Sequence, residues 1–332
     1  MLLGFPFTLG FGVLCVVGSL MSLSAFHWLG IWFGLELNLL GFIPLLVQGG
    51  LDQQVESSVK YFIVQALGSS FLLVGGFAQG VFYNLWGVGG VLFVLLLGLF
   101  LKLGVAPFHW WVPSVMGGLS WVSCGLLATW QKLAPLFLLF SFCGSFFYFF
   151  FCFACVSALV GGVGGVGQVQ LRILMAYSSI AHLGWMMGLA SCSVLGSFCY
   201  YLYYFFLSVF VFFGLGQSGV LRFSHVGYST GLFVLIGLVS LGGLPPFSGF
   251  VPKWVGLQIV SGLELYYLAV FLVVGSVISL YYYFSLAFML FISRFVSYKF
   301  SFGFFSVSYI MSVGVVVFCL GFPLYEFFFT VL

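Results

Sequence analysis

Residues 104–113 read Gly-Val-Ala-Pro-Phe-His-Trp-Trp-Val-Pro, and residues 243–252 read Gly-Leu-Pro-Pro-Phe-Ser-Gly-Phe-Val-Pro. Gly, Pro, Phe, Val and Pro recur at the same spacing, with an aromatic residue before each Val. Both copies stand inside long apolar segments, where a proline interrupts the hydrogen-bond ladder of a helix. The repeat therefore predicts two membrane helices broken at matching points, as in transporters built from inverted repeats.

The composition around these two segments is that of a membrane protein. The 332 residues are 64% hydrophobic and only 4% charged, and the mean hydropathy is +1.30. Runs such as residues 146–153 are uniformly apolar rather than alternating, which argues against a membrane β-barrel. Cysteines such as Cys152 and Cys155 fall in these runs and are interpreted as packing residues. The fold class predicted is an all-α polytopic membrane protein.

Turn residues and charges divide the chain into eleven predicted transmembrane helices. They are placed at 2–21, 26–48, 58–78, 88–112, 120–141, 143–164, 169–190, 194–216, 228–260, 265–292 and 304–330. The ninth is too long for one straight span and is predicted to be broken or re-entrant. We expect a single membrane domain, 1–332, with inverted five-helix repeats at approximately 1–142 and 143–292 and a C-terminal helix at 304–330.

The loop charges are distributed unequally between the two sides that this count implies. The side of the N-terminus receives Lys60, Arg172, Arg222, Arg294 and Lys299, whereas the other side receives Glu264 and Glu326. Basic loops stay on the cytoplasmic side of a membrane or its matrix equivalent. The N-terminus is therefore predicted on that side and the C-terminus on the opposite one.

Four charged residues lie within the apolar segments: Glu36, Lys102, Lys132 and Lys253. A charge at the centre of a membrane helix costs about 3 kcal/mol on insertion scales, so it usually has a function and a partner. Burial and a nearby carboxylate act in opposite directions on a lysine, which makes a buried Lys–Glu pair an adjustable proton site. The pattern indicates a proton path. Glu36 could instead serve helix packing, and Lys253 could extend to the membrane interface.

The prolines supply polar groups beside these lysines. Each frees the carbonyl four residues earlier, and that carbonyl must be satisfied by side chains or water. The pairs are Pro107 with Leu103, Pro135 with Gln131, and Pro246 with Gly242. We expect a hydrated pocket at each break. His109 and His182 either join the relay or form ordinary hydrogen bonds inside the bundle.

Several motifs are similar to one protein family over essentially the whole chain. They are Gly34-Leu35-Glu36-Leu37-Asn38, Phe42-Ile43-Pro44, Lys60-Tyr61-Phe62, Lys102-Leu103-Gly104, Pro107-Phe108-His109, Gln131-Lys132, the segment 176–185 and Gly249-Phe250-Val251-Pro252-Lys253-Trp254. By these motifs the chain resembles the mitochondrially encoded chain 2 family of NADH-ubiquinone oxidoreductase, an antiporter-like membrane subunit of respiratory complex I. The scarcity of Thr (four) and Asn (two) also favours an organellar gene.

The resemblance implies a fold and a set of roles. The chain looks like the fourteen-helix antiporter-like plan without its first three helices. Glu36 and Lys102 would form a modulating ion pair, Lys132 would be the central relay, and Lys253 would lie toward the outlet. The chain would carry no flavin, iron–sulfur cluster, nucleotide or metal, and would not bind NADH or nucleic acid. Its partners would be other membrane-arm subunits and the lipid of the mitochondrial inner membrane.

Two other functions compete with a proton-translocating subunit of a redox-driven complex. One is a cation/proton antiporter subunit of the same fold. The other is a structural membrane subunit whose buried charges only hold helices together. The number of lysines and their depth argue against a purely structural role.

Overall fold

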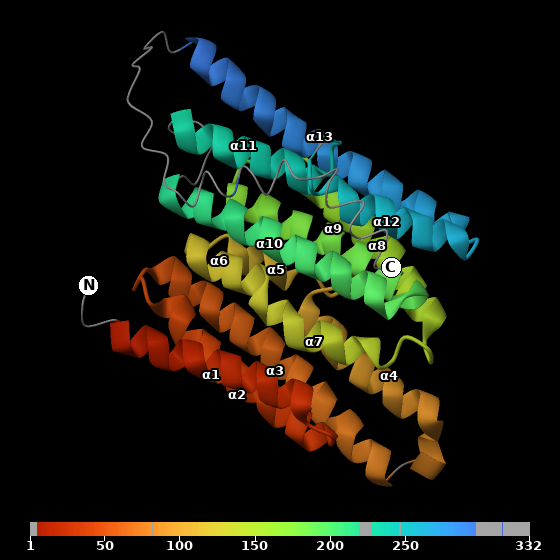
Figure 1. Cartoon of the computed structure of the whole chain (residues 1–332). Helices are drawn as coiled ribbons and strands as arrows, with labels where there is room; N and C mark the ends of the chain where they lie inside the picture. The colour runs from red at the N-terminus through yellow and green to blue at the C-terminus, as the bar shows by residue number, and fades with distance from the viewer. Residues whose placement is uncertain (1–4, 82, 219–227, 246, 297–313, 315–332) are drawn as a thin grey trace. The chain divides into compact units, whose positions relative to one another are not determined.

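The computed structural model describes residues 5–81, 83–218, 228–245, 247–296 and Gly314, and within them it contains helices and no strand (Figure 1). The chain divides into two compact units, residues 1–145 and residues 146–332. This bears out the predicted all-α class. The predicted helix 304–330 lies outside the described residues, Gly314 apart.

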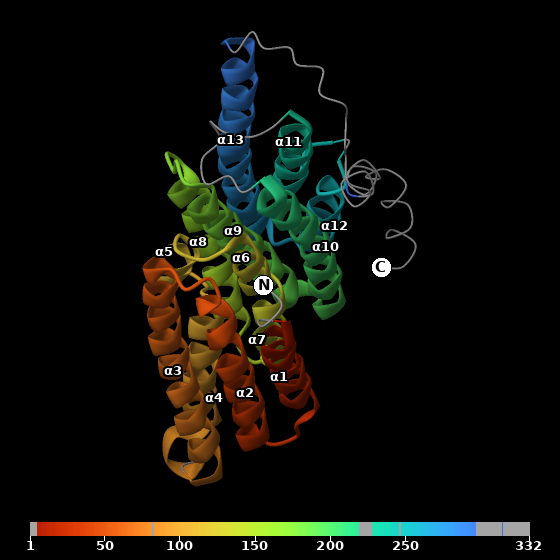
Figure 2. The same ribbon diagram turned by 90° about the vertical axis from the view of Figure 1, so that its left-hand side faces the viewer.

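The first unit contains seven helices among its described residues. They are α1 (Phe5–Ser24), α2 (Trp28–Val47), α3 (Asp52–Val81), α4 (Tyr83–Leu103), α5 (Trp111–Met116), α6 (Trp121–Ala128) and α7 (Trp130–Phe140). Helix α1 packs along α2, and α3 packs along both α4 and α2 (Figure 2). Helix α7 contacts α4, which carries Lys102, and it also contacts α6 and α1.

Glycines allow α1 and α2 to approach at backbone distance. A Cβ atom on Gly18 would lie 2.5 Å from the backbone nitrogen of Asn38, and one on Gly34 would lie 2.5 Å from that of Ser22. Small residues at such contacts are the usual means by which membrane helices associate closely. The backbone of α2 around Asn38 is therefore held firmly by α1.

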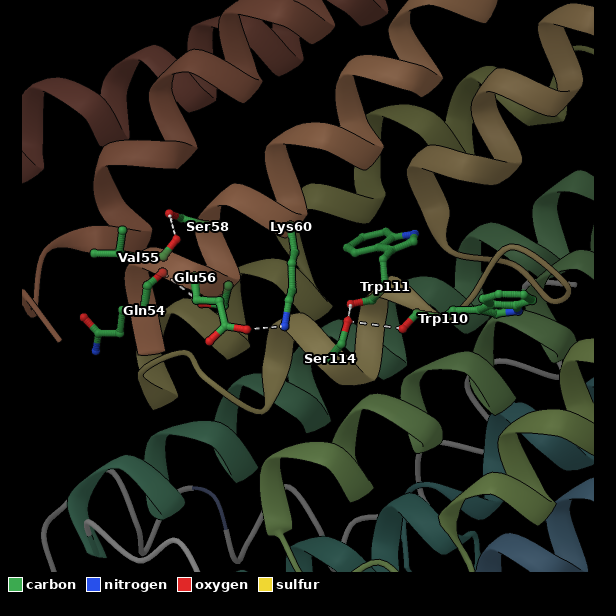
Figure 3. Close-up of polar contacts among 9 residues, drawn as sticks. Gln54, Val55, Glu56, Ser58, Lys60, Trp110, Trp111 and Ser114 are labelled. Carbon is green, nitrogen blue, oxygen red and sulfur yellow. Dashed lines mark hydrogen bonds and ion pairs between the residues drawn. The ribbon is translucent and has the colours of Figure 1, made fainter. Parts of the chain in front are cut away.

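The first predicted break is present. Helix α4 ends at Leu103, Gly104 has a φ of +71°, and α5 begins only at Trp111. The Ser114 hydroxyl then donates to the carbonyls of Trp110 and Trp111 at the start of α5 (Figure 3). Gly104 is needed here because its positive φ is costly for a residue with a side chain.

A further interruption, at Thr129, was missed by the sequence analysis, which treated 120–141 as one helix. Thr129 adopts φ −111° and ψ −80° between α6 and α7, and its hydroxyl donates to the Gly125 carbonyl at 2.6 Å. Hydroxyl bonding to the carbonyl four residues back bends helices, and Pro135 inside α7 removes a ladder donor from the next turn.

The described residues of the second unit form six helices. They are α8 (Phe147–Gly165), α9 (Leu171–Cys192), α10 (Val194–Ser218), α11 (Tyr228–Gly242), α12 (Phe250–Gly262) and α13 (Tyr266–Val296). Helix α9 lies at the centre, since it contacts α8, α10, α12 and α13. The second break separates α11 from α12, and Gly243 there has a φ of +79°. Pro246, within this break, lies outside the described residues.

Within the described residues, eight segments are long and apolar enough to cross a membrane, one of which, Trp121–Phe140, comprises α6 and α7 together. The shorter apolar segments Gly89–Leu103 and Phe233–Gly242 belong to the two predicted broken spans. A chain with this many apolar helices is a multi-pass membrane protein.

Candidate functional site

Lys102 lies in the last turn of α4, directly before the break. Its side chain is 6% exposed, which rules out extension to an interface. Gly68 on α3 makes room for its stem, because a Cβ there would come within 3.0 Å of Lys102 Cγ. Side chains donate to two carbonyls of the last turn of α4, next to the break. Gln65 Nε2 donates to the Lys102 carbonyl at 3.2 Å, and Trp111 Nε1 donates to that of Leu101 at 3.1 Å.

Lys132 lies in the first turn of α7, immediately after the interruption at Thr129. Its backbone N–H donates to the Thr129 carbonyl at 3.1 Å. The side chain is 3% exposed, so this lysine is also buried. The interruption therefore brings a lysine to a helix end, as the break after α4 does for Lys102.

Lys102 and Lys132 line one cavity of about 20 Å³. A water molecule requires roughly 10 to 15 Å³ of space open to its centre, so the cavity has room for about one water. Its polar lining comes from four further side chains: Asn38, Tyr61, Gln65 and Gln131. The two lysines, whose helices α4 and α7 are separated in sequence by α5 and α6, thus share a small polar space.

Glu36 stands on α2, two residues before Asn38. Its Oε2 atom is buried and has no hydrogen-bond partner among the residues that the structure describes. The ion pair found among the described residues joins Lys60 Nζ to Glu56 Oε1 at 2.6 Å, near the exposed start of α3 (Figure 3). Glu36 and Lys102, both described, do not form a direct ion pair here, and their modulating relation stays a prediction.

Asn38 and Gln131 form a two-bond amide pair between α2 and α7. Asn38 Nδ2 donates to Gln131 Oε1 at 2.9 Å, and Gln131 Nε2 donates to Asn38 Oδ1 at 3.1 Å. Asn38 lies two residues after Glu36, and Gln131 directly precedes Lys132. The pair connects the helix that carries the carboxylate to the helix that carries the lysine.

Lys253 lies near the start of α12 and is 8% exposed. Its Nζ donates to the carbonyls of Gly242 at 2.7 Å and Leu241 at 3.2 Å, the last two residues before the break. The predicted freed carbonyl of Gly242 is thus satisfied by the lysine itself. Gly243 leaves space for that side chain, since a Cβ there would lie 2.8 Å from Lys253 Cδ.

His182 lines the same cavity as Lys253 in the second unit. This cavity, of about 10 Å³, is also lined by hydroxyl groups, from Ser178, Ser276, Ser279, Tyr282 and Tyr283. His182 Nδ1 is 2.9 Å from the hydroxyl of Tyr200, and the His182 ring lies against Tyr204 with centroids 4.9 Å apart. A histidine, a lysine and several hydroxyls therefore meet around one small space.

His109 has different surroundings. It lies in the segment between α4 and α5 and is half-buried, with Nδ1 3.2 Å from the Pro107 carbonyl. It is not among the residues that line the Lys102–Lys132 cavity. The structure thus brings Lys102 and Lys132 together, brings Lys253 and His182 together, and leaves His109 beside the proline of its own turn.

The amides Asn38, Gln65 and Gln131 are functional candidates that the sequence analysis did not single out. Each is a polar residue in an apolar helix, which is itself a signal of an internal partner. The sequence alone does not reveal their partners. Asn38 and Gln131 bond to each other, and Gln65 donates to the Lys102 carbonyl.

Comparison with known proteins places the chain in one family. The family model described as "NADH:quinone oxidoreductase/Mrp antiporter, TM" matches residues 25–279. NADH-ubiquinone oxidoreductase chain 2 of Lumbricus terrestris is 38% identical over 81% of this chain and 82% of its own length. The protein of the same name from Anopheles gambiae is 38% identical over 85% of each chain.

Solved structures share the architecture. A chain of respiratory complex I from Thermus thermophilus superimposes with a TM-score of 0.77 at 25% identity, over 94% of this chain and 77% of that one. A chain of the Mrp complex from Dietzia sp. DQ12-45-1b gives a TM-score of 0.75 at 19% identity, over 83% and 59% of the two chains, and shows the fold alone. The broken helices, the buried lysines and these matches agree, and the chain belongs to the NADH-ubiquinone oxidoreductase chain 2 family of antiporter-like membrane subunits.

Proposed function

We propose that this chain is a proton-translocating membrane subunit of respiratory complex I in the mitochondrial inner membrane. The names of its relatives support the complex, and the family description supports an antiporter-type membrane domain. The observation that carries the proposal is the cavity shared by Lys102 and Lys132, because two buried amines beside about one water form a minimal unit for proton transfer.

In the first unit, Lys102 receives a proton under the influence of Glu36 and passes it to Lys132 through the cavity. A carboxylate near an ammonium stabilises the charged form, so a change in the Glu36–Lys102 separation changes how firmly Lys102 holds its proton. Transfer follows when that stabilisation weakens. We assign Lys132 as the central relay because it lies directly after the interruption between α6 and α7 and lines the same cavity as Lys102.

In the second unit, Lys253 is the proton site toward the outlet, and His182 is its neighbour in the relay. The two carbonyls that accept from Lys253 stabilise its protonated form. The hydroxyl groups around the cavity supply donors and acceptors that reorient without moving the helices. His109 is a weaker candidate for the relay, since its hydrogen bond is to its own turn.

The redox reaction belongs to other subunits in this proposal. The chain itself holds no flavin, cluster, nucleotide or metal and does not bind NADH; the energy of NADH oxidation reaches it through contacts with other membrane subunits. Its N-terminus faces the matrix and its C-terminus the intermembrane space, which rests on the loop charge asymmetry.

Replacement of Lys132 by alanine tests the relay. The Lys132→Ala complex should assemble, because the change removes a buried amine without introducing a larger group, while proton translocation driven by NADH falls sharply. Lys132→Arg should be only partly active, because arginine keeps its proton at all relevant pH values. The matched control is Lys60→Ala, which removes an exposed lysine from the same unit. Normal translocation by assembled Lys132→Ala complexes would refute the relay.

Co-purification separates the proposal from the antiporter alternative. If the chain is a subunit of complex I, affinity purification through a tag on this chain after detergent extraction should also recover the NADH-oxidising subunits. Recovery of the chain with cation-exchange activity and without NADH oxidation would support the antiporter instead.

A further inference from the structure

The Asn38–Gln131 pair joins a buried amide, Asn38, to a partly buried one, Gln131. Two amides bonded to each other contribute only a modest net free energy, and replacing both by apolar groups of the same shape can be nearly neutral. An isolated buried amide, in contrast, is costly. A bonded amide pair inside apolar helices therefore suggests a requirement for a fixed relative position.

The geometry of the pair specifies that position. In the two-bond arrangement each amide commits its carbonyl and one N–H, at 2.9 and 3.1 Å, which fixes both the separation and the mutual orientation of the side chains. The second N–H of each amide is left for a water in the cavity that both residues line. The pair thus connects α2 to α7 and also forms part of the wall of the Lys102–Lys132 cavity.

The two ends of the pair are held differently. The backbone at Asn38 is fixed by α1, through the close approach of Gly18 and a contact of 3.6 Å from Cys15 Sγ to the Asn38 carbonyl. Gln131 lies in the first turn of α7, whose N-cap residue Thr129 makes no side-chain capping bond. Through Gln131, the end of α7 that carries Lys132 has a direct hydrogen-bonded connection to α2 at Asn38.

We propose that the Asn38–Gln131 amide pair is a positioning device that holds the first turn of α7 so that Lys132 shares a cavity with Lys102. The inference rests on the proposed proton-transfer role of Lys132 and adds two residues that act through it. The fixed point is α2 at Asn38, and the positioned group is the Lys132 side chain, one residue beyond Gln131.

Three variants test the pair in the assembled complex. Gln131→Met breaks it and leaves Asn38 unpaired. The double variant Asn38→Leu/Gln131→Met removes both amides and restores apolar packing. The exchange Asn38→Gln/Gln131→Asn keeps two amides and the same total side-chain length across the gap. Each is compared with the parent and with Lys132→Ala by the yield of assembled complex, its thermal denaturation and the ratio of protons translocated to NADH oxidised.

A positioning role predicts a separation of stability from function. The double apolar variant should assemble and denature near the parent temperature, yet its proton-to-NADH ratio should fall to the level of Lys132→Ala. The exchange variant should recover a ratio close to the parent. A double apolar variant that translocates normally, or an exchange variant that stays as low as the double one, would overturn the positioning role. Normal translocation by Lys132→Ala would instead refute the relay on which the inference rests.

Discussion

At the scale of single residues, the buried lysines differ in how their charge is accommodated. Lys253 donates to two carbonyls that a helix break has freed, whereas Lys102 and Lys132 face a polar cavity. An unsatisfied buried carbonyl or ammonium costs several times more than a single hydrogen bond contributes. Lys253 therefore satisfies two buried carbonyls and is at the same time the proposed proton site of the second unit.

Replacement of Lys253 by methionine should lower both stability and transport. The Leu241 and Gly242 carbonyls lose their donor, at a cost of about 1–3 kcal/mol for each unsatisfied group. We expect a lower denaturation temperature of the complex by differential scanning calorimetry, together with reduced NADH-driven proton translocation. Lys60→Met, at an exposed residue of the first unit, is the control and should leave the denaturation temperature close to that of the parent. An unchanged denaturation temperature for Lys253→Met would show that the two carbonyls find other donors.

The charged residues were predictable from the sequence, but their partners were not. A lysine or glutamate in an apolar span is visible in the sequence itself, and all three lysines proved buried. Asn38 and Gln131, in contrast, are separated by 93 positions. Which helices lie side by side decides whether two such amides meet, and no local pattern carries that information.

At the scale of elements, the two broken helices share a glycine with positive φ before a proline-containing turn. The proline spacing predicted these two breaks. The interruption at Thr129 escaped because it combines a hydroxyl bond to the preceding turn with a proline six residues later, and each feature alone is tolerated in a membrane helix.

Substitution at the second break should displace Lys253. Gly243→Ala introduces a left-handed residue, at a cost of about 1–2 kcal/mol, and places a methyl group against the Lys253 side chain. Gly167→Ala is the matched control, since Gly167 has a φ of +82° with no atom within 4 Å of the added Cβ. Proton translocation should fall for Gly243→Ala well below the value for Gly167→Ala; equal values would mean that backbone strain alone is responsible.

An added methyl group should disturb the contact between α1 and α2 at Gly34 but not at Gly10. A Cβ at Gly34 meets the backbone of Ser22 at 2.5 Å, whereas one at Gly10 meets nothing within 4 Å. Gly34→Ala should therefore destabilise the complex, and Gly10→Ala should be neutral or stabilising by about 0.5–1 kcal/mol because alanine favours the helix. Thermal denaturation of both variants provides the comparison, and equal tolerance would contradict the close helix approach.

At the scale of the whole molecule, much of the apolar surface of the helices faces outward. On α1, large side chains such as Phe7, Val13 and Leu20 are more than half exposed. In a membrane protein such faces contact lipid or neighbouring subunits. We expect the chain to be unstable alone. Purification of an active, monodisperse monomer would contradict this expectation.

The orientation in the membrane can be tested with single cysteines. Lys60→Cys should react with an impermeant thiol reagent from the matrix side, and Glu264→Cys, in the exposed turn between α12 and α13, from the other side. The parent chain is the control, because its native Cys152 is exposed. Labelling of both positions from the same side would refute the topology derived from the loop charges.

The placement of the lysines around the two glycine breaks has an evolutionary consequence. Lys102 stands two residues before Gly104, and the matching position before Gly243 is Leu241, whose carbonyl receives the Lys253 ammonium from across the break. If the halves descend from one duplicated ancestor, the glycine before the proline is the feature that they share, and the lysine is not, since it stands before the glycine in one half and after it in the other.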